Sequence, residues 1–440
     1  MLTTRTKMGV QNSELPGFYK LSVEERRKKI AEVAGLPASE VDGWQPGTGV
    51  DIGILDRMIE NVVGAFSLPL GIATHFLVNG KDYLVPMAIE EPSVVAAASH
   101  AAKIARAGGG FHAMVSAPQM IGQVQILGAK DPHGALHRIL EDETRLLELA
   151  NAKDPVLAKV GGGARRLEAR VVESPRGPMI IVHLVVDVRD AMGANAVNTM
   201  SEALAPEFAR LAEGRSHLRI ISNLAIYRVA RSRAVFPRDS LAFGDWKGSD
   251  VVDGILDAWA MAACDPFRCA THNKGIMNGI SAVAIATGND FRALESGAHS
   301  YAAWKARPGG VIAPLSTYEQ DANGNLVGTI ELPMAVGTVG GATVSHPTAR
   351  LNVRLLGISG AEELARVITS VGLAQNFAAL RALATEGIQK GHMSLHARNV
   401  AMAAGANASE VDRVAEALAR SGTVRIDKAK EILSTLRSHA

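Results

Sequence analysis

The chain has 440 residues, of which 47% are hydrophobic, 20% charged and 4% aromatic, and its formal net charge at pH 7 is +2. This length exceeds one ordinary hydrophobic core, so we expect two or three domains. The small net charge argues against a nucleic-acid-binding protein, which needs a concentrated basic face.

Only two cysteines, Cys264 and Cys269, occur in the sequence. They cannot build a disulfide framework, which favours a reducing cytoplasm. The N-terminal MLTTRTK has no apolar stretch like that of a signal peptide. No apolar run approaches about 20 residues, the length of a membrane-spanning helix. We therefore expect a soluble, cytoplasmic protein.

The first two predicted helices carry clear start and stop signals. Ser22 and Glu25 form a capping-box pattern for a helix that Gly35 ends. Pro92 is placed in the first turn of the second helix, which runs to the glycines at 108–110. Small apolar residues dominate this second helix, so we expect it to be mostly buried.

Residues 120–225 alternate between strand and helix patterns. Strands are predicted at 123–127, 165–173, 179–188 and 218–221, and helices at 134–150 and 196–212. The order β-α-β-β-α-β is that of the split βαβ, or ferredoxin-like, unit.

The rest of the chain has mixed α/β character. Helices are predicted at 255–263 and 291–304, a strand at 329–334, a glycine-dense loop at 336–343, and a helical tail at the C-terminus. We therefore predict an α/β (α+β) fold.

The segment from Asp265 to Asn278 concentrates polar side chains, Arg268 and Lys274 among them, in a run with almost no strand or helix pattern. A core tolerates such groups only when they are hydrogen-bonded. We therefore predict the floor of a polar pocket. A lysine buried there, near Asp290 of the following TGND turn, becomes a fixed cation that can stabilise an oxyanion.

Six ordered motifs carry a resemblance to a known family. They are PMAIEE at 86–91, DAMGAN at 190–195, THNKGIMN at 271–278, TGND at 287–290, VGTVGG at 336–341 and GHM at 391–393. Together they closely resemble the soluble bacterial class II of 3-hydroxy-3-methylglutaryl-coenzyme A (HMG-CoA) reductase, over roughly residues 15–430. Six motifs in one order are far more specific than any single one.

The resemblance implies a large α/β substrate domain, an inserted ferredoxin-like cofactor domain and a C-terminal helical flap. The large domain then comprises residues 1–116 and 227–386, the cofactor domain 117–226 and the flap 387–440. The resemblance also implies a homodimer with interfacial active sites, often assembled into hexamers.

The family converts HMG-CoA to mevalonate and coenzyme A by two successive hydride transfers. By resemblance, Lys274 stabilises the oxyanion and Asp290 holds that lysine. Glu91 protonates the carbonyl oxygen, and His392 protonates the departing thiolate. Two alternatives stay open, because Glu90 adjoins Glu91 and Asp290 also suits the N-cap of the following helix.

The cofactor signal is indirect, because no G-x-G-x-x-G motif follows a strand. By resemblance, Asp190, Met192, Gly193 and Asn195 bind the cofactor, and its pyrophosphate meets a helix N-terminus at Gly193. Asp154 matches an acidic position that engages the adenosine ribose and repels the extra phosphate of NADP. The resemblance therefore favours NAD(H) over NADP, although Asp154 followed by proline is also a good helix N-cap.

Arg268 is the best partner for the substrate carboxylate, because its planar guanidinium suits bidentate pairing. By resemblance, Ser93, Thr271, Asn278 and Gln375 are further pocket residues. Core positions would explain Ser93 and Gln375 equally well.

Other functions compete with a reductase. His392 and His396 suggest zinc, but the segment lacks the glutamate of H-E-x-x-H and a third ligand, so no metal is expected. A Schiff-base lyase would centre on Lys274, and a thiolase-like acyl transferase on Cys264 or Cys269, neither of which has a placed histidine base. A catalytically inactive dinucleotide-binding scaffold would not need the four catalytic residues together.

Overall fold

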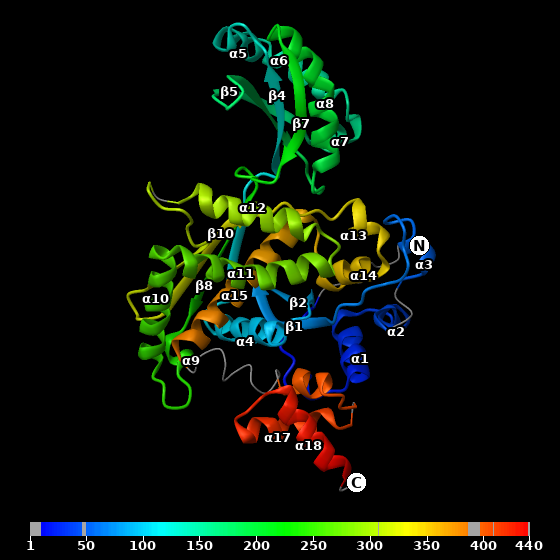
Figure 1. The fold of residues 1–440 in the computed structure, drawn as a ribbon, viewed down its shortest axis with the longest axis vertical. Coiled ribbons are helices and arrows are strands. Elements are labelled where there is room, and N and C mark those ends of the chain that lie inside the picture. The colour runs from blue at the N-terminus through cyan, green and yellow to red at the C-terminus, as the bar shows by residue number, and fades with distance from the viewer. Residues whose placement is uncertain (1–9, 46–49, 307, 386–396, 408, 439–440) are drawn as a thin grey trace.

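The computed structural model describes residues 10–45, 50–306, 308–385, 397–407 and 409–438. Figure 1 shows three parts stacked along the long axis: a small α/β unit, a larger α/β unit and a helical C-terminal unit. The predicted mixed α/β fold is confirmed.

The larger unit is built on a six-stranded sheet with the order β2-β1-β3-β8-β10-β9. Its strands are β1 (Leu70–Val78), β2 (Lys81–Ala88), β3 (Phe111–Val115), β8 (Val229–Phe236), β9 (Ser316–Gln320) and β10 (Leu326–Pro333). Neighbours are antiparallel except β1 and β3. Because Phe111 pairs with Ala234 and Val115 with Ala230, the chain leaves this sheet and re-enters it on adjacent strands.

Long helices pack on this sheet and on one another. They are α4 (Val94–Ala107), α10 (Gly248–Cys264), α11 (Pro266–Ala286), α12 (Phe291–Trp304) and α15 (Ala361–Ala384). α15 is central, since it contacts α4, α10, α11, β3, β8 and β10. Among the described residues, α15 is also the one helix long and apolar enough to cross a membrane, but 67% of its apolar window is buried inside the protein, as in the core helix of a domain.

The N-terminal helix α1 (Val23–Ala34) has the predicted capping box. Glu25 N donates to Ser22 Oγ, and Ser22 N donates to the Glu25 carboxylate at 2.7 Å. Together with α14 (Pro347–Leu356), α1 encloses a separate apolar cluster. The shorter helices are η1 (Phe18–Lys20), α2 (Ala38–Val41), η2 (Asp42–Trp44), α3 (Ile52–Leu55), α9 (Arg238–Leu241) and α13 (Gly341–Ser345).

The smaller unit has a four-stranded antiparallel sheet with the order β5-β6-β4-β7. Its elements are β4 (Gln119–Leu127), α5 (Pro132–Glu141), α6 (Glu143–Asn151), α7 (Pro155–Lys159), β5 (Gly163–Val172), β6 (Met179–Asp187), α8 (Ala194–Leu211) and β7 (Arg215–Ser222). The four strands occur in the predicted order, with helices between the first two and the last two as predicted, but a further helix, α7, precedes β5. The unit has a core of its own. The domain boundaries themselves stay predictions.

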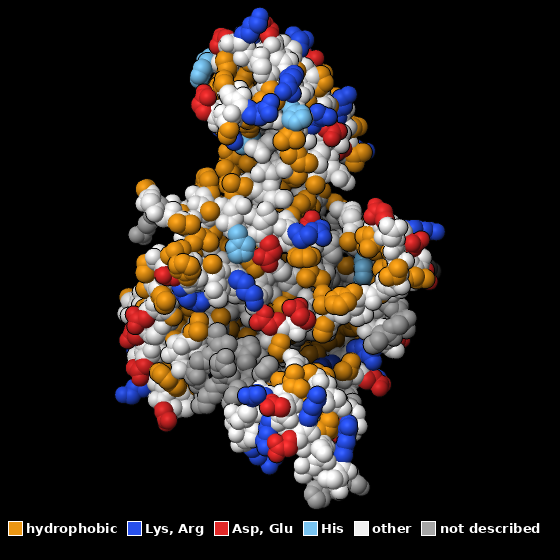
Figure 2. Space-filling view, viewed as in Figure 1, with side chains coloured by type: hydrophobic (Ala, Val, Ile, Leu, Met, Phe, Trp, Pro, Cys, Tyr) orange, Lys and Arg blue, Asp and Glu red, His pale blue; other side chains and the backbone are white. Residues whose placement is uncertain are grey.

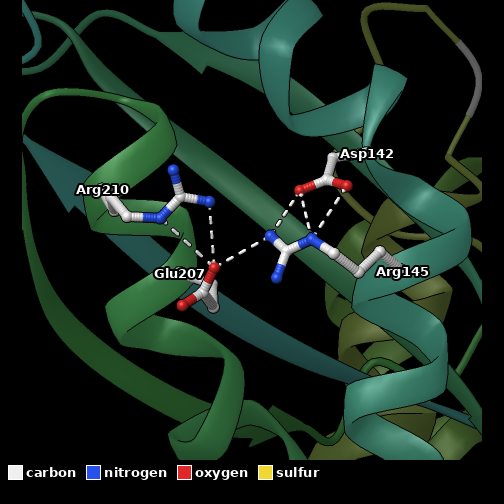
Figure 3. A network of polar contacts seen from close by, with 4 residues as sticks. All are labelled: Asp142, Arg145, Glu207 and Arg210. Atoms are coloured by element: carbon white, nitrogen blue, oxygen red, sulfur yellow. Dashed lines mark hydrogen bonds and ion pairs between the residues drawn. The ribbon is translucent and has the colours of Figure 1, made fainter.

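One helix predicted at 134–150 is in fact two, α5 and α6, which meet at Asp142. Figure 3 shows that the Asp142 carboxylate binds the guanidinium of Arg145, which reaches across to Glu207 on α8 at 2.8 Å. Arg210 donates to the same glutamate. These groups are partly exposed, so the network contributes modestly to stability while tying α6 to α8.

The C-terminal unit contains α17 (Val411–Ser421) and α18 (Ile426–Ser438), which pack with residues 397–406 around a small apolar cluster. In Figure 2, acidic and basic side chains are interspersed over this unit and over the small α/β unit. This mixing on the face shown agrees with the near-zero net charge.

Two local predictions are wrong. The polar segment from Asp265 to Asn278 is not irregular, because almost all of it belongs to α11, which Asp265 caps through the backbone N–H of Arg268. Pro92 is not in the first turn of a helix, since α4 begins at Val94.

Candidate active site

Lys274, Glu91 and Asn278 meet at one polar contact. Lys274 Nζ lies 3.1 Å from Oε2 of Glu91, and Asn278 Nδ2 donates to the same oxygen at 3.3 Å. Lys274 and Asn278 are four residues apart on α11 and therefore share a face, while Glu91 follows β2. The Lys274 side chain is 60% exposed, so the prediction of a buried lysine is wrong for a single chain.

α11 has two chemically different faces. Thr271 and Lys274 are exposed and Asn278 is half-buried, at the spacing of one helix face. His272 and Asn273 point the other way and are buried. The helix can therefore anchor itself in the core with one set of polar residues and present another set outward.

The buried anchor is a short hydrogen-bond chain. His272 Nε2 lies 2.7 Å from Ser316 Oγ, which donates to Asn376 Oδ1 at 2.8 Å. Burial, and then the charge of Arg268, lower the pKa of His272 to about 3, so this imidazole is neutral at physiological pH. These hydrogen bonds fix the rotation of α11 about its axis, and they therefore also fix the direction in which Lys274 leaves the helix.

Asp290 caps α12. Its Oδ1 accepts from the backbone N–H groups of Arg292 and Ala293, and it pairs with the Arg292 guanidinium at 3.2 Å. Within the described residues, Asp290 makes no hydrogen bond or ion pair with Lys274. The N-cap role therefore describes Asp290 in a single chain.

Glu295 is an acid near Lys274 that sequence reasoning missed. It accepts from Ser281 Oγ at 2.6 Å and from His299 at 3.2 Å. Burial acts to raise the pKa of Glu295, but the hydrogen bonds from His299 and Ser281 and the charge of Lys274 together lower it. A glutamate inside a helix carries no motif, so only the fold reveals this proximity.

Two predicted substrate residues have buried polar atoms for which the described part of the chain offers no hydrogen-bond partner. They are Ser93 Oγ, at a residue with φ of 73° just before α4, and Gln375 Oε1 within α15. Orphaned buried polar atoms are rare, and a ligand or water can satisfy them. Arg268 is half-buried near the start of α11, six residues before Lys274.

The predicted cofactor turn joins β6 to α8. Gly193 has φ of 108°, and a Cβ there would lie 2.7 Å from Val188, so glycine is required. Within the described ranges, no side-chain cap engages the N-terminus of α8, so its first backbone N–H groups can meet an anion. Met192 is half-buried and Asn195 is exposed.

Three motifs converge beside this turn. The Asp190 carbonyl accepts from Thr338 N at 2.9 Å, and Asp190 Oδ1 accepts from Ala361 N at 2.7 Å. Gly337 N donates to Asn289 Oδ1 at 2.7 Å. DAMGAN, TGND and VGTVGG therefore form one junction between the two α/β units, where the Asp190 carboxylate is already engaged by backbone.

A cavity at this junction, lined in part by Arg189, Asp190 and Glu363, is remote from the Lys274 contact. Lys81, at the start of β2, pairs with Glu363, whereas Glu91 follows the end of that strand. A strand of this length spans roughly 25 Å. The cavity therefore borders the cofactor turn and not the lysine.

Asp154 caps α7, accepting from Leu157 N at 2.9 Å with Pro155 in the first turn. Its contact with a cofactor stays a prediction. His392 and His396 lie outside the described residues. In the described part of the chain, no group of three or more His, Cys, Asp or Glu residues is placed to hold a metal ion.

The family model described as hydroxymethylglutaryl-coenzyme A reductase matches residues 22–397. The chain is 60% identical to the 3-hydroxy-3-methylglutaryl-coenzyme A reductase of Archaeoglobus fulgidus, covering 97% of this chain and 95% of that protein. It is 36% identical to the probable enzyme of that name from Borreliella burgdorferi, covering 87% and 85%.

Solved structures give the same result. One structure of the Streptococcus pneumoniae reductase has a TM-score of 0.82 at 41% identity, covering 96% of this chain and all of that one. Another, the class II enzyme bound to NADPH in open conformations, has a TM-score of 0.80 at 42% identity, covering 95% and 100%. The chain therefore belongs to the hydroxymethylglutaryl-coenzyme A reductase family.

Proposed function

We propose that this chain interconverts HMG-CoA and mevalonate plus coenzyme A by two successive hydride transfers with NAD(H). The observation that carries the proposal is the contact of Lys274 and Asn278 with Glu91 in a member of this family. Hydride addition to a carbonyl leaves negative charge on oxygen, which then needs a proton. Lys274 stabilises that charge, Glu91 supplies the proton, and Asn278 orients the carboxyl group.

The substrate carboxylate pairs with Arg268 in this proposal. Thr271 lies between Arg268 and Lys274 on α11. Ser93 and Gln375 offer the orphaned polar atoms described above, which a substrate would satisfy. His392 protonates the coenzyme A thiolate, and the C-terminal helical unit acts as the flap that brings it there.

The proposed assembly is a homodimer whose active sites lie at the interface between the two copies. Such dimers can assemble further into hexamers. Asp290 of one copy reaches Lys274 of the other. Two observations support this arrangement: Lys274 is exposed, and among the described residues of a single chain it bonds to Glu91 and not to Asp290. Phe267, 85% exposed on α11, offers an aromatic side chain for burial in such an interface.

For the cofactor, the pyrophosphate binds the N-terminus of α8 at Gly193, beside Met192 and Asn195, and Asp154 engages the adenosine ribose. A carboxylate there favours NAD(H) over NADP(H). The related S. pneumoniae enzyme was solved with bound NADPH, so the proposed preference for NAD(H) is a difference between the present chain and that enzyme. The two free cysteines suit a cytoplasmic enzyme.

The decisive experiment is absorbance-monitored oxidation of mevalonate in the presence of coenzyme A, with NAD and separately with NADP. We expect turnover with NAD and weaker turnover with NADP. Absence of turnover with both would overturn the proposal. A Schiff-base lyase would instead be trapped at Lys274 by borohydride and a carbonyl substrate, but family membership favours the reductase.

A further inference from the structure

Arg228 is a buried cation that none of the assigned roles uses. It lies where the chain returns from the small α/β unit to β8, and its side chain is almost fully buried, with 5% of the residue exposed. Its backbone carbonyl accepts from Met334 N at 2.9 Å, which fixes the residue to the end of β10. Arg228 therefore belongs to the frame of the larger unit.

Its guanidinium binds backbone carbonyls from both units. Nη1 donates to Ala191 O at 3.0 Å and to Met192 O at 2.9 Å, and Nη2 donates to Val336 O at 2.5 Å. Ala191 and Met192 belong to the cofactor turn, whereas Val336 opens the glycine loop of the larger unit. One planar side chain thus joins two motifs from different units, which a single ammonium group could not do with the same geometry.

Among the residues that the structure describes, no carboxylate forms an ion pair with Arg228. Burial lowers its pKa to about 10, and the more distant Asp187, Asp190 and Glu362 act in the opposite direction. The side chain therefore stays protonated at physiological pH. A buried cation is costly unless it is hydrogen-bonded, so three carbonyl partners are needed to hold it there.

These contacts also set the direction of the turn. In a trans peptide, C=O and the following N–H point in opposite directions. With the Met192 carbonyl on Arg228, the N–H of Gly193 is turned away from the guanidinium, toward the side where α8 begins. Close packing supports this orientation, because a Cβ at Gly337 would lie 2.6 Å from Met192 N.

We propose that Arg228 is the positioning residue of the cofactor turn: it aims the N–H groups at the start of α8 toward the pyrophosphate and adds positive charge beneath them. This inference rests on the proposed cofactor role of the turn. Arg228 itself touches neither cofactor nor substrate. Its effect should therefore appear in dinucleotide binding and much less in binding of mevalonate or HMG-CoA.

The test compares Arg228→Gln and Arg228→Lys in the full-length enzyme, with NADH affinity measured by fluorescence titration and KM measured for each substrate. We expect Arg228→Gln to raise the Kd for NADH and the KM for NAD by about tenfold or more, since charged hydrogen bonds are lost beneath the turn. The KM for mevalonate should change by less than about twofold. Arg228→Lys, which keeps the charge but not the fork, should recover part of the loss.

Arg231→Gln is the matched control, because Arg231 lies three residues further along, within β8, but is exposed and paired with Glu331. It should leave both constants unchanged. The inference is wrong if the folded Arg228→Gln variant binds NADH with normal affinity. It is also wrong if the KM for NAD and the KM for mevalonate rise by the same factor. If neither Arg228 variant folds, Gly337→Ala disturbs the same turn by pressing a methyl group against Met192 N, and it must reproduce the selective loss of NADH affinity for the inference to stand. Wild-type protein without nicotinamide turnover would instead refute the proposed function.

Discussion

Lys274 and Glu91 are 183 positions apart in the sequence, yet the ammonium of one lies 3.1 Å from the carboxylate of the other. The contact arises because α11 packs against β2, and Glu91 follows the end of that strand. Asn278, one turn along α11, donates to the same oxygen. Within one chain, the acid partner of the lysine is therefore Glu91, and Asp290 is left to act elsewhere.

Replacing Lys274 by alanine should abolish turnover while the protein stays folded. The side chain is exposed, so its loss leaves no cavity, but the developing oxyanion loses its cation. We expect the rate to fall by at least about 100-fold. Steady-state oxidation of mevalonate measures the rate, and circular dichroism checks the fold. Lys28→Ala is the control, because Lys28 is also exposed, on α1, and among the described residues its ion pair is with Glu24. Activity near that of the wild type in Lys274→Ala would rule out the oxyanion role.

Mixing two inactive variants tests whether the site is shared between copies. If Asp290 of one copy serves Lys274 of the other, a dimer of Lys274→Ala with Asp290→Ala contains one intact site. Co-expression in equal amounts should then restore about a quarter of wild-type activity, because half of the dimers are mixed and each has one working site of two. Each variant alone should be inactive. No recovery in the purified mixed dimer would place both residues in the same copy.

Asp154 can be tested with a matched pair of substitutions that separates its two roles. Asparagine keeps the N-cap of α7 but removes the charge, whereas alanine removes both. We expect Asp154→Asn to lower the ratio of NAD to NADP activity with little change in stability. Asp154→Ala should lower that ratio and also cost about 1 kcal/mol of unfolding free energy. Kinetics with both cofactors and urea unfolding provide the measurements. An unchanged cofactor ratio in both variants would leave Asp154 as a cap alone.

His272 makes the stability of the larger unit depend on pH. Its pKa is about 3 in the folded chain, against an ordinary value of 6.5. Between these values the unfolded chain binds more protons than the folded one, so the unfolding free energy falls as pH drops below 6.5. The expected slope from this group is about 1 kcal/mol per pH unit.

Urea unfolding at pH 5, 6 and 7 checks this expectation. His272→Gln should flatten the pH dependence in that window, whatever its effect on stability at pH 7. His112→Gln, at an exposed position, should leave the slope as in the wild type. Equal slopes in all three proteins would contradict a buried neutral imidazole.

The sequence revealed the small unit better than the large one for a physical reason. Its strand and helix patterns follow one another in the order of a recurrent motif, so the order alone indicates the sheet, including the distant pairs of β4 with β6 and β7. The six-stranded sheet depends on pairs such as Phe111 with Ala234, which no local pattern announces. α11 was missed because His272 and Asn273 put polar groups on its buried face, where a helix pattern requires apolar ones.

The site was predictable as a set of residues but not as an arrangement. Motif resemblance named Lys274, Glu91 and Asn278, which the fold brings together. It also placed Asp290 beside Lys274, which a single chain does not do. Glu295 and Arg228 belong to no sequence motif. Only the fold brings Glu295 near Lys274, and Arg228 binds backbone carbonyls, which do not depend on side-chain identity.

The neck between the two α/β units has a consequence for engineering. At this neck, Ser116 on the outgoing segment is hydrogen-bonded to residues 227–229 on the returning segment. Its N–H donates to Val229 O, and its hydroxyl group donates to Tyr227 O at 2.8 Å and accepts from Val229 N. The outgoing and returning segments thus lie side by side, like the two arms of a hairpin. Residues 117–226 could be exchanged for a tight turn without removing a backbone hydrogen bond of the six-stranded sheet, at the loss of the contacts that Asp190, Ala191 and Met192 make with the larger unit. Because both connections lie at this one place, the small α/β unit can be moved to another protein as a single insert, together with the Arg228 contacts that hold it.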